Sequence, residues 1–161
     1  MSADRRPSWT VFATAAAVLT LDIVSKALVR ATLDGQPPIE LIPGVFRLRY
    51  VTNTGGAFGL SQSTPWFFAA AAMAVSIWIV IRALRGVEAT WLAVGMGLVL
   101  GGALGNLVER AAGGLDMSGA VTDFLDVGIW PVFNLADSAI VVGAIVLGFA
   151  LSRRGADEPA P

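Results

Sequence analysis

Two aspartates, Asp123 and Asp137, are the residues of this chain whose type and spacing best suit chemistry. They lie 14 residues apart, so a short loop between them can bring their carboxyl groups together. Two carboxylates within a few ångströms of each other cannot both ionise cheaply, and the pair tends to hold one proton. The ionised member can take a proton from water while the protonated member donates a hydrogen bond to a carbonyl, as in aspartic proteases. We therefore predict that Asp123 and Asp137 form a catalytic dyad.

The residue types that the chain lacks favour the same chemistry. The 161 residues contain no cysteine and no histidine. Their absence excludes disulfides, cysteine nucleophiles, the usual histidine base of hydrolases and nearly every zinc site. Carboxylates and one lysine, Lys26, remain for proton transfer. We therefore expect no metal and no cofactor.

The composition is that of a membrane protein. The chain is 55% hydrophobic and 14% charged, with a mean hydropathy of +0.71, more apolar than a soluble domain of this length requires. Its net charge of −1 and lack of a basic block give no reason to expect a nucleic-acid partner. The segments long enough to cross a hydrocarbon layer of about 30 Å are approximately residues 9–30, 65–84, 90–110 and 130–151. We expect one integral membrane domain, residues 1–161, that is all-α with four transmembrane helices.

The basic residues predict how these helices are oriented. They flank the predicted spans on one side, as Arg5, Arg6, Arg82, Arg85, Arg153 and Arg154. By the positive-inside rule that side is cytoplasmic, so both termini are inside. Residues 31–64 and 111–129 are then extracytoplasmic loops. Within the first, apolar and basic side chains alternate over residues 45–52, which predicts an amphipathic strand. Its aromatic face lies either toward lipid or, in a small hairpin, over the bundle.

Six polar residues fall in pairs at the outer ends of the predicted spans. The pairs are Asp22 with Lys26, Asn106 with Arg110, and Asn134 with Asp137. Residues three or four apart share one face of a helix, so all three pairs should reach the same outer layer. Each also has a structural alternative: an ion pair that sets helix register for Asp22, an interfacial anchor for Arg110, and a helix cap for Asp137. For Asp123 the alternative is a solvated loop residue.

Five blocks of the sequence closely resemble those of the bacterial lipoprotein signal peptidases, also called signal peptidase II. In the family's order they are residues 22–26, 53–58, 101–110, 121–124 and 133–138. The resemblance implies an aspartic endopeptidase of the bacterial inner membrane that removes the signal peptide of prolipoproteins. It implies a cut before a diacylglyceryl-modified cysteine, near the outer face, with the diacylated precursor and membrane lipids as partners. We expect a monomer.

By this resemblance Asp123 and Asp137 match the catalytic pair of the family. The other matching positions, which would hold the substrate backbone, the dyad or the first helix in place, are Asp22, Lys26, Asn53, Gly55, Asn106, Arg110, Asn134 and Ala136. Glu109 departs from the family, which usually has aspartate there. The segment before Asp123 looks longer than usual and the one between the two aspartates looks shorter, which leaves Asp116 and Asp126 as rival carboxylates.

Three other functions fit parts of the pattern. A small proton-coupled transporter could use Asp22, Lys26 and Asp137 as a relay, but a relay should extend to the cytoplasmic side, where the predicted spans carry no ionisable groups. A serine/lysine peptidase would need a serine on the face of Lys26, and neighbouring Ser25 points elsewhere on a helix. A purely structural scaffold would tolerate loss of both aspartates.

Overall fold

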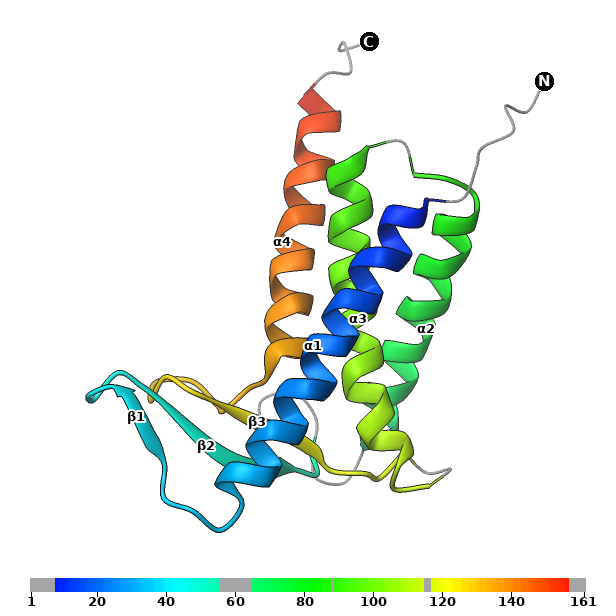
Figure 1. Ribbon diagram of the computed structural model, residues 1–161. Coiled ribbons are helices and arrows are strands. Elements are labelled where there is room, and N and C mark those ends of the chain that lie inside the picture. Colours follow the sequence, from blue (N-terminus) through cyan, green and yellow to red (C-terminus); the bar gives the residue numbers. More distant parts are fainter. Residues whose placement is uncertain (1–7, 56–64, 88, 115–116, 157–161) are drawn as a thin grey trace, which may run out of the picture.

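The computed structural model describes residues 8–55, 65–87, 89–114 and 117–156. Within these ranges lie helices α1 (Trp9–Leu33), α2 (Pro65–Leu84), α3 (Thr90–Ala111) and α4 (Leu135–Ala156), and strands β1 (Ile39–Ile42), β2 (Phe46–Asn53) and β3 (Val121–Asp126). The helices form one bundle, and the strands form a small sheet at one end of it (Figure 1). Helix α3 packs against each of the other three helices.

Three of the helices match the length and hydropathy of membrane spans. Among the described residues these are Trp9–Leu33, Trp66–Leu84 and Thr90–Ala111. The apolar part of α4, Leu135–Ala150, is shorter. Large apolar side chains such as Leu21, Ile77 and Ile145 are exposed on the sides of the bundle, where a bilayer would cover them. The part of the chain that the structure describes is therefore mostly helical, with three candidate spans and a three-stranded sheet.

Glycines on two faces of α3 let the neighbouring helices approach closely. A Cβ atom at Gly97 would lie 2.7 Å from the carbonyl oxygen of Val11, and one at Gly101 would lie 2.7 Å from that of Ala15, both on α1. A Cβ atom at Gly102 would collide with the carbonyl oxygen of Ala136, at the start of α4. Small residues at such positions allow backbone-to-backbone packing in membranes. These glycines therefore determine how closely α1 and α4 pack against α3, and so how close the polar residues of the three helices lie to one another.

We expect the Gly102→Ala variant to unfold at a lower temperature than wild type. The added methyl group forces the first turn of α4 away from α3, and overpacking of this kind lowers stability by about 1–3 kcal/mol. Gly148→Ala is the matched control, because nothing lies within 4 Å of its Cβ position and alanine favours a helix by up to about 1 kcal/mol. Thermal unfolding of both variants in one detergent checks this. Equal melting temperatures would contradict it.

The sheet has the order β1-β2-β3 with antiparallel pairing throughout. Leu48 and Tyr50 of β2 pack, with Phe124 of β3, against Val29 and Leu33 of α1. The expectation that this face meets lipid is therefore wrong for Leu48 and Tyr50, because these side chains cover the end of α1. The alternative, a hairpin that covers the bundle, is confirmed. Strand β3 lies within a segment that the sequence analysis treated only as a loop.

The helix bounds match the predicted segments closely except at α4, which begins at Leu135 instead of residue 130 and ends at Ala156 instead of residue 151. Phe133 prevents an earlier start, because its N–H donates to the carbonyl of Leu125 at 3.0 Å and its own carbonyl accepts from Leu125 at 2.8 Å. These bonds attach the residues before α4 to β3. Helix α1 runs three residues beyond the predicted end, to Leu33.

Candidate active site

Asp123 lies on β3 and is 3% exposed. Each of its carboxylate oxygens accepts a hydrogen bond from an asparagine amide. The Nδ2 atom of Asn53, on the neighbouring strand, donates to Oδ2 at 2.9 Å, and Nδ2 of Asn134 donates to Oδ1 at 2.7 Å. Asp123 is thus not the solvated loop residue of the alternative interpretation. Its carboxylate has a set position between β2 and the start of α4.

Asn134 and Asp137 form a reciprocal cap at the N-terminus of α4. The Oδ1 atom of Asn134 accepts from the Asp137 N–H at 2.9 Å, and Oδ2 of Asp137 accepts from the Asn134 N–H at 3.2 Å. This is a capping box with aspartate in place of the usual glutamate or glutamine. The cap turns Nδ2 of Asn134 toward Asp123. Asp137 is therefore a helix-capping residue, as in the structural alternative, and the same cap links it to Asp123 through Asn134.

Asn106 of α3 completes the link between the two aspartates. Its Nδ2 atom donates to Oδ1 of Asp137 at 2.8 Å. Its Oδ1 atom accepts from Nζ of Lys26 at 3.0 Å and from Nδ2 of Asn134 at 3.2 Å. Because an ammonium group only donates, Lys26 determines which way the Asn106 amide points. The lysine therefore directs an N–H group of Asn106 at Asp137.

Lys26 is buried and has three acceptors. Besides Asn106, its Nζ atom lies 2.7 Å from Oδ2 of Asp22 and 3.0 Å from Oε2 of Glu109. Asp22, which is fully buried, also accepts from the backbone N–H of Ala136 at 3.0 Å. Asp22 and Lys26 thus connect α1 to α3 and to the first turn of α4. All three polar pairs noted in the sequence meet in one network.

Glu109, Thr122 and Arg30 also belong to this network, although none of the three is among the predicted site residues. Glu109 accepts from the Thr122 N–H at 2.9 Å and from the Thr122 hydroxyl at 2.8 Å. The Arg30 guanidinium donates to Glu109 at 2.8 Å and to the Thr122 hydroxyl at 2.7 Å. Because Thr122 precedes Asp123, Glu109 anchors the strand that carries the first aspartate. The position of Glu109 directly before Arg110, within the matching block 101–110, is the sequence feature that could have indicated its place in the site.

Arg110 is buried and points toward β2 instead of reaching the membrane surface. Its Nη2 atom donates to the carbonyl of Gly55 at 2.6 Å, and the Gly55 N–H donates to Oδ1 of Asn53 at 3.0 Å. The interfacial-anchor alternative for Arg110 is therefore wrong. Its Nη1 atom is buried and has no hydrogen-bond partner among the described residues. Residues 56–58 of the matching block lie outside the described residues.

The rival carboxylate Asp126 has a different environment. It is 2% exposed and lies 2.7 Å from the Nε atoms of both Arg47 and Arg49, and its Oδ1 atom accepts from the Gly128 N–H at 2.8 Å. The hydrogen bonds from Arg47 and Gly128 lower the pKa of Asp126. It is a buried structural carboxylate, paired with two arginines of β2. The other rival, Asp116, lies outside the described residues.

Asp123 differs from Asp126 in the direction of its pKa shift. Burial, strengthened by the nearby charge of Asp137, raises the pKa of Asp123 to about 6, against the opposing effect of the hydrogen bonds from Asn53 and Asn134. A carboxyl group with this pKa carries a proton for part of the time near neutral pH. The pair can therefore hold one proton under physiological conditions. Within the described ranges, no three acidic side chains are placed to hold a metal ion.

We expect the Asp123→Asn variant to gain stability relative to wild type as the pH rises from about 4 to about 6. The pKa of Asp123 is about 6 in the folded protein and about 4 in an unfolded chain. Between these values the folded wild type binds more protons, so its stability falls with rising pH, by up to about 3 kcal/mol. The variant does not titrate there. The difference in melting temperature, measured from pH 4 to pH 8, should rise accordingly.

Asp126→Asn is the control for this measurement, with the opposite sign. The pKa of Asp126 is lowered in the folded protein, so its contribution to stability is present above pH 4 and is lost as the pH falls through the folded pKa. This variant should be less stable than wild type at pH 7, with a difference that shrinks in acid. The same slope for both variants would contradict the assignment of opposite shifts.

Comparison with known proteins places these residues in a family context. The family model described as "Signal peptidase (SPase) II" matches residues 14–153. A protein named lipoprotein signal peptidase from Rhodococcus jostii is 46% identical over 139 residues, covering 85% of this chain and 69% of the relative. A protein of the same name from Syntrophomonas wolfei is 45% identical over 130 residues, covering 81% and 84%.

Solved structures agree with the sequence comparison. One, described as a bacterial membrane enzyme, has a TM-score of 0.77 and 25% sequence identity, and the match covers 99% of this chain and 98% of that chain. A second structure with the same description has a TM-score of 0.77 and 28% identity, with coverage of 91% and 95%. The whole fold, including the sheet, therefore has a counterpart among membrane enzymes.

Proposed function

Because the chain belongs to the signal peptidase II family, we propose that it is an aspartic endopeptidase that removes the signal peptide of prolipoproteins in a bacterial membrane. Asp123 and Asp137 are its catalytic dyad. The observation that carries this assignment is the position of Asn134, which hydrogen-bonds Asp123 through its side chain and Asp137 through its backbone and side chain. The transporter alternative finds no support in the comparisons.

The reaction needs one proton on the dyad. The ionised aspartate takes a proton from a water molecule as its oxygen attacks the scissile carbonyl carbon, and the protonated aspartate gives its proton to the carbonyl oxygen. The resulting tetrahedral intermediate collapses when a proton reaches the amide nitrogen and the C–N bond breaks. Asn53, Asn106 and Asn134 keep the two carboxylates oriented for both steps, since each donates to Asp123 or Asp137.

The remaining matched residues position the dyad or the substrate. Asp22 and Lys26 hold α1 against α3 and α4, through Asn106 and Ala136. Arg110 holds Gly55, two residues after the end of β2. Its buried Nη1 atom, which lacks a partner among the described residues, is the donor that we assign to a substrate carbonyl oxygen.

We propose a single integral membrane domain, residues 1–161, with α4 as a fourth transmembrane helix. Its 22 residues are about 33 Å long at the helical rise. The first residue of α1, the last residue of α4 and the α2–α3 connection lie at one end of the bundle, opposite the sheet (Figure 1). Arg82 and Arg85 lie at that connection, which supports a cytoplasmic assignment for it. The site is then near the outer face of the inner membrane.

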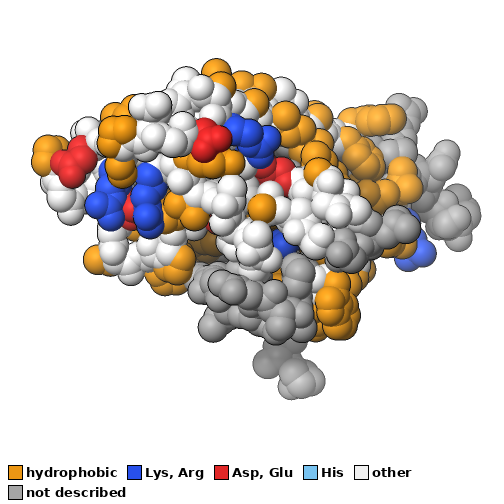
Figure 2. All heavy atoms as spheres, turned by 90° about the horizontal axis from the view of Figure 1, so that it is seen from below, with side chains coloured by type: hydrophobic (Ala, Val, Ile, Leu, Met, Phe, Trp, Pro, Cys, Tyr) orange, Lys and Arg blue, Asp and Glu red, His pale blue; other side chains and the backbone are white. Residues whose placement is uncertain are grey.

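Figure 2 views the molecule from the proposed outer end and shows acidic and basic side chains gathered among apolar ones. We propose a monomeric enzyme, because a single chain is sufficient to supply both aspartates and the three asparagine amides that bond them. We assign no metal to the reaction. A chelator should leave cleavage unchanged.

The decisive experiment compares two versions of one precursor with purified enzyme. One version carries a diacylglyceryl group on the cysteine that follows the signal peptide, and the other is unmodified. We expect cleavage directly before the cysteine of the diacylated version alone. Equal cleavage of both would show that the lipid is not recognised, and cleavage of neither would contradict the peptidase assignment.

A further inference from the structure

The sheet extends to one side of the helix bundle, at the end that holds the site (Figure 1). We name the projecting part the overhang and define it as residues 39–46, which are β1 and the turn into β2, with residues 127–133, which join β3 to α4. Its apolar side chains are notably exposed, with Val45 at 59%, Ile129 at 95% and Trp130 at 54%. Val45 and Ile129 carry no polar side-chain group that could join the network around the two aspartates.

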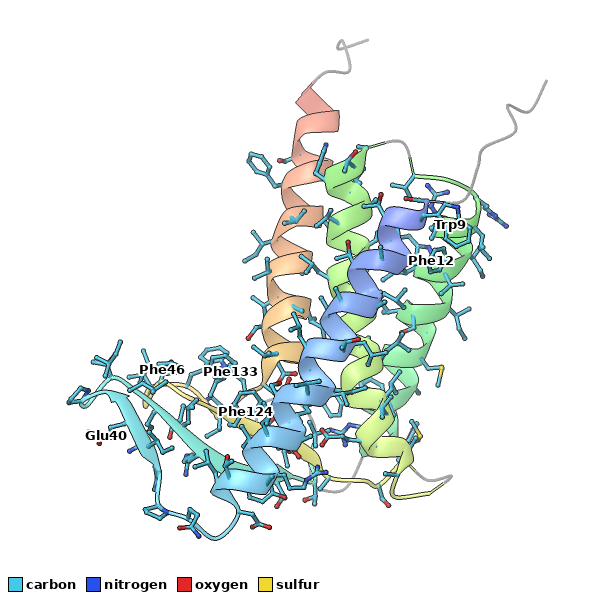
Figure 3. The ribbon with its side chains drawn as sticks, in the orientation of Figure 1. Trp9, Phe12, Glu40, Phe46, Phe124 and Phe133 are labelled. Carbon is cyan, nitrogen blue, oxygen red and sulfur yellow. The ribbon has the colours of Figure 1, made fainter. Side chains whose placement is uncertain are left out.

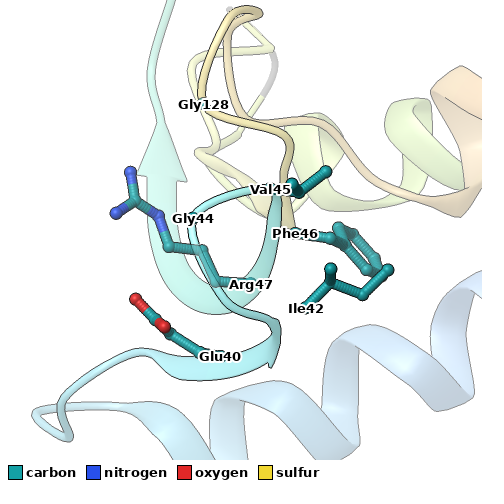
Figure 4. Close-up of a pocket in the computed structure, with 7 residues that line it drawn as sticks. All are labelled: Glu40, Ile42, Gly44, Val45, Phe46, Arg47 and Gly128. Carbon is teal, nitrogen blue, oxygen red and sulfur yellow. The ribbon is translucent and has the colours of Figure 1, made fainter.

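The two faces of the overhang differ in polarity. In Figure 4, Ile42, Val45 and Phe46 lie on one side of the hairpin, and the side chains of Glu40 and Arg47 lie on the other. The register agrees, since Ile42 pairs with Phe46 and Glu40 pairs with Arg47. The charged face carries both signs of charge. It therefore suits water and head groups, while the other face suits an apolar medium.

The apolar face of the overhang is on the side of the sheet that faces the helix bundle. In Figure 3, Phe46 and Phe133 stand on the side of the sheet nearest the bundle, and Glu40 stands on the far side. Leu48, further along β2, packs on the end of α1. Beyond α1 the same face continues over the overhang, where exposed apolar residues have no helix above them.

The start of α4 limits how far the overhang can lie from the membrane. Trp130 is five residues before Leu135, the first residue of α4. The exposed face of α4, with Val141 at 58% and Ile145 at 65%, is the surface that lipid covers in a membrane-spanning helix. Residues 127–133 of the overhang directly precede this helix in the chain. Tryptophan is enriched where hydrocarbon meets head groups.

We propose that the overhang rests in the outer leaflet of the bilayer, with Ile129, Trp130 and Val45 inserted among the lipid chains. Glu40 and Arg47 face head groups and water. Because residues 127–133 join Asp123 to Asp137, this contact ties the depth of both aspartates to the lipid surface, where a diacylated cysteine is held. The inference rests on the membrane placement in the proposed function but not on the catalytic roles.

A nitroxide label at Ile129→Cys tests this directly, because the chain has no native cysteine. The labelled protein is placed in vesicles of phosphatidylcholine and phosphatidylglycerol, and its collisions with oxygen and with a water-soluble nickel chelate are measured. Labels at Ile145→Cys and Asp34→Cys serve as the lipid and water references, since Ile145 is on the exposed face of α4 and Asp34 is an exposed residue at the end of α1.

We expect the Ile129 label to show a several-fold higher ratio of oxygen to nickel collisions than the Asp34 label, close to that at Ile145. A ratio equal to that at Asp34 would overturn the proposal. So would spin–spin broadening at Ile129 that disappears on dilution with unlabelled protein, which would show that a second copy covers this surface. Cleavage of diacylated precursor by the same labelled protein separates the two hypotheses, because an active enzyme with an aqueous label refutes only the overhang.

Discussion

Asp123→Asn and Asp137→Asn should each lower kcat for cleavage of a diacylated precursor by about 10²- to 10⁴-fold, the range for loss of a positioned acid or base. An amide can neither take a proton from the attacking water nor give one to the carbonyl oxygen. Single-turnover cleavage in detergent, with enzyme in excess, measures the effect on chemistry apart from substrate binding.

Asp126→Asn is the matched control for these two variants. Asp126 is another buried carboxylate of β3, three residues from Asp123, but its partners are Arg47, Arg49 and Gly128. We expect it to lose stability and to keep kcat. A dyad variant that retains kcat near that of wild type would rule out Asp123 and Asp137 as the reacting pair. Melting temperatures of all three variants show whether a loss of activity reflects unfolding.

Of the variants proposed here, Lys26→Met should lower the free energy of unfolding the most. It removes the cation from the buried carboxylate of Asp22 and the partly buried one of Glu109, and breaking a buried ion pair on one side lowers stability by about 3–5 kcal/mol. Asp22→Asn combined with Lys26→Met should restore part of the loss, because one uncompensated charge is then removed. Denaturant unfolding of the single and double variants in one detergent measures the coupling.

Arg30→Met is the control for the lysine variant, since Arg30 is on the same helix and bonds the same Glu109. Its side chain is 52% exposed, and exposed pairs contribute about 0–1 kcal/mol. Lys26→Met should also lower kcat more than it changes KM, because the Asn106 amide is then free to turn its oxygen toward Asp137. Equal destabilisation by the two variants would show that burial of the lysine network has no special effect.

The helices could be predicted well from the sequence because helix formation in a membrane depends on local properties. A run of apolar residues long enough to cross the bilayer must satisfy its own backbone groups, so α2 has the predicted bounds and α3 differs by one residue. The pairing of Asp22 with Lys26 could be predicted for the same reason, since residues four apart share a helix face. The absence of cysteine and histidine by itself excludes cysteine nucleophiles and histidine bases, and leaves carboxylates as the main candidates for proton transfer.

The site's connections could not be predicted, because they join segments that are distant in the chain. Strand β3 is six residues long and forms by pairing with β2, about 70 residues earlier. Strand propensity depends strongly on such partners, so Asp123 could only be placed in a loop. The roles of Glu109 and Thr122 depend on α3 meeting β3.

The amino-acid sequence was sufficient to identify a membrane chain, the two aspartates and the family blocks around them, since each is a matter of residue type and short spacing. The tertiary structure was needed for the direction of each amide. Asn134 points at Asp123 because it caps α4, and Asn106 points at Asp137 because Lys26 occupies its oxygen. The direction of each hydrogen bond in such a network depends on all of the groups that pack around it. These groups come from distant parts of the chain, so no local stretch of sequence predicts the direction.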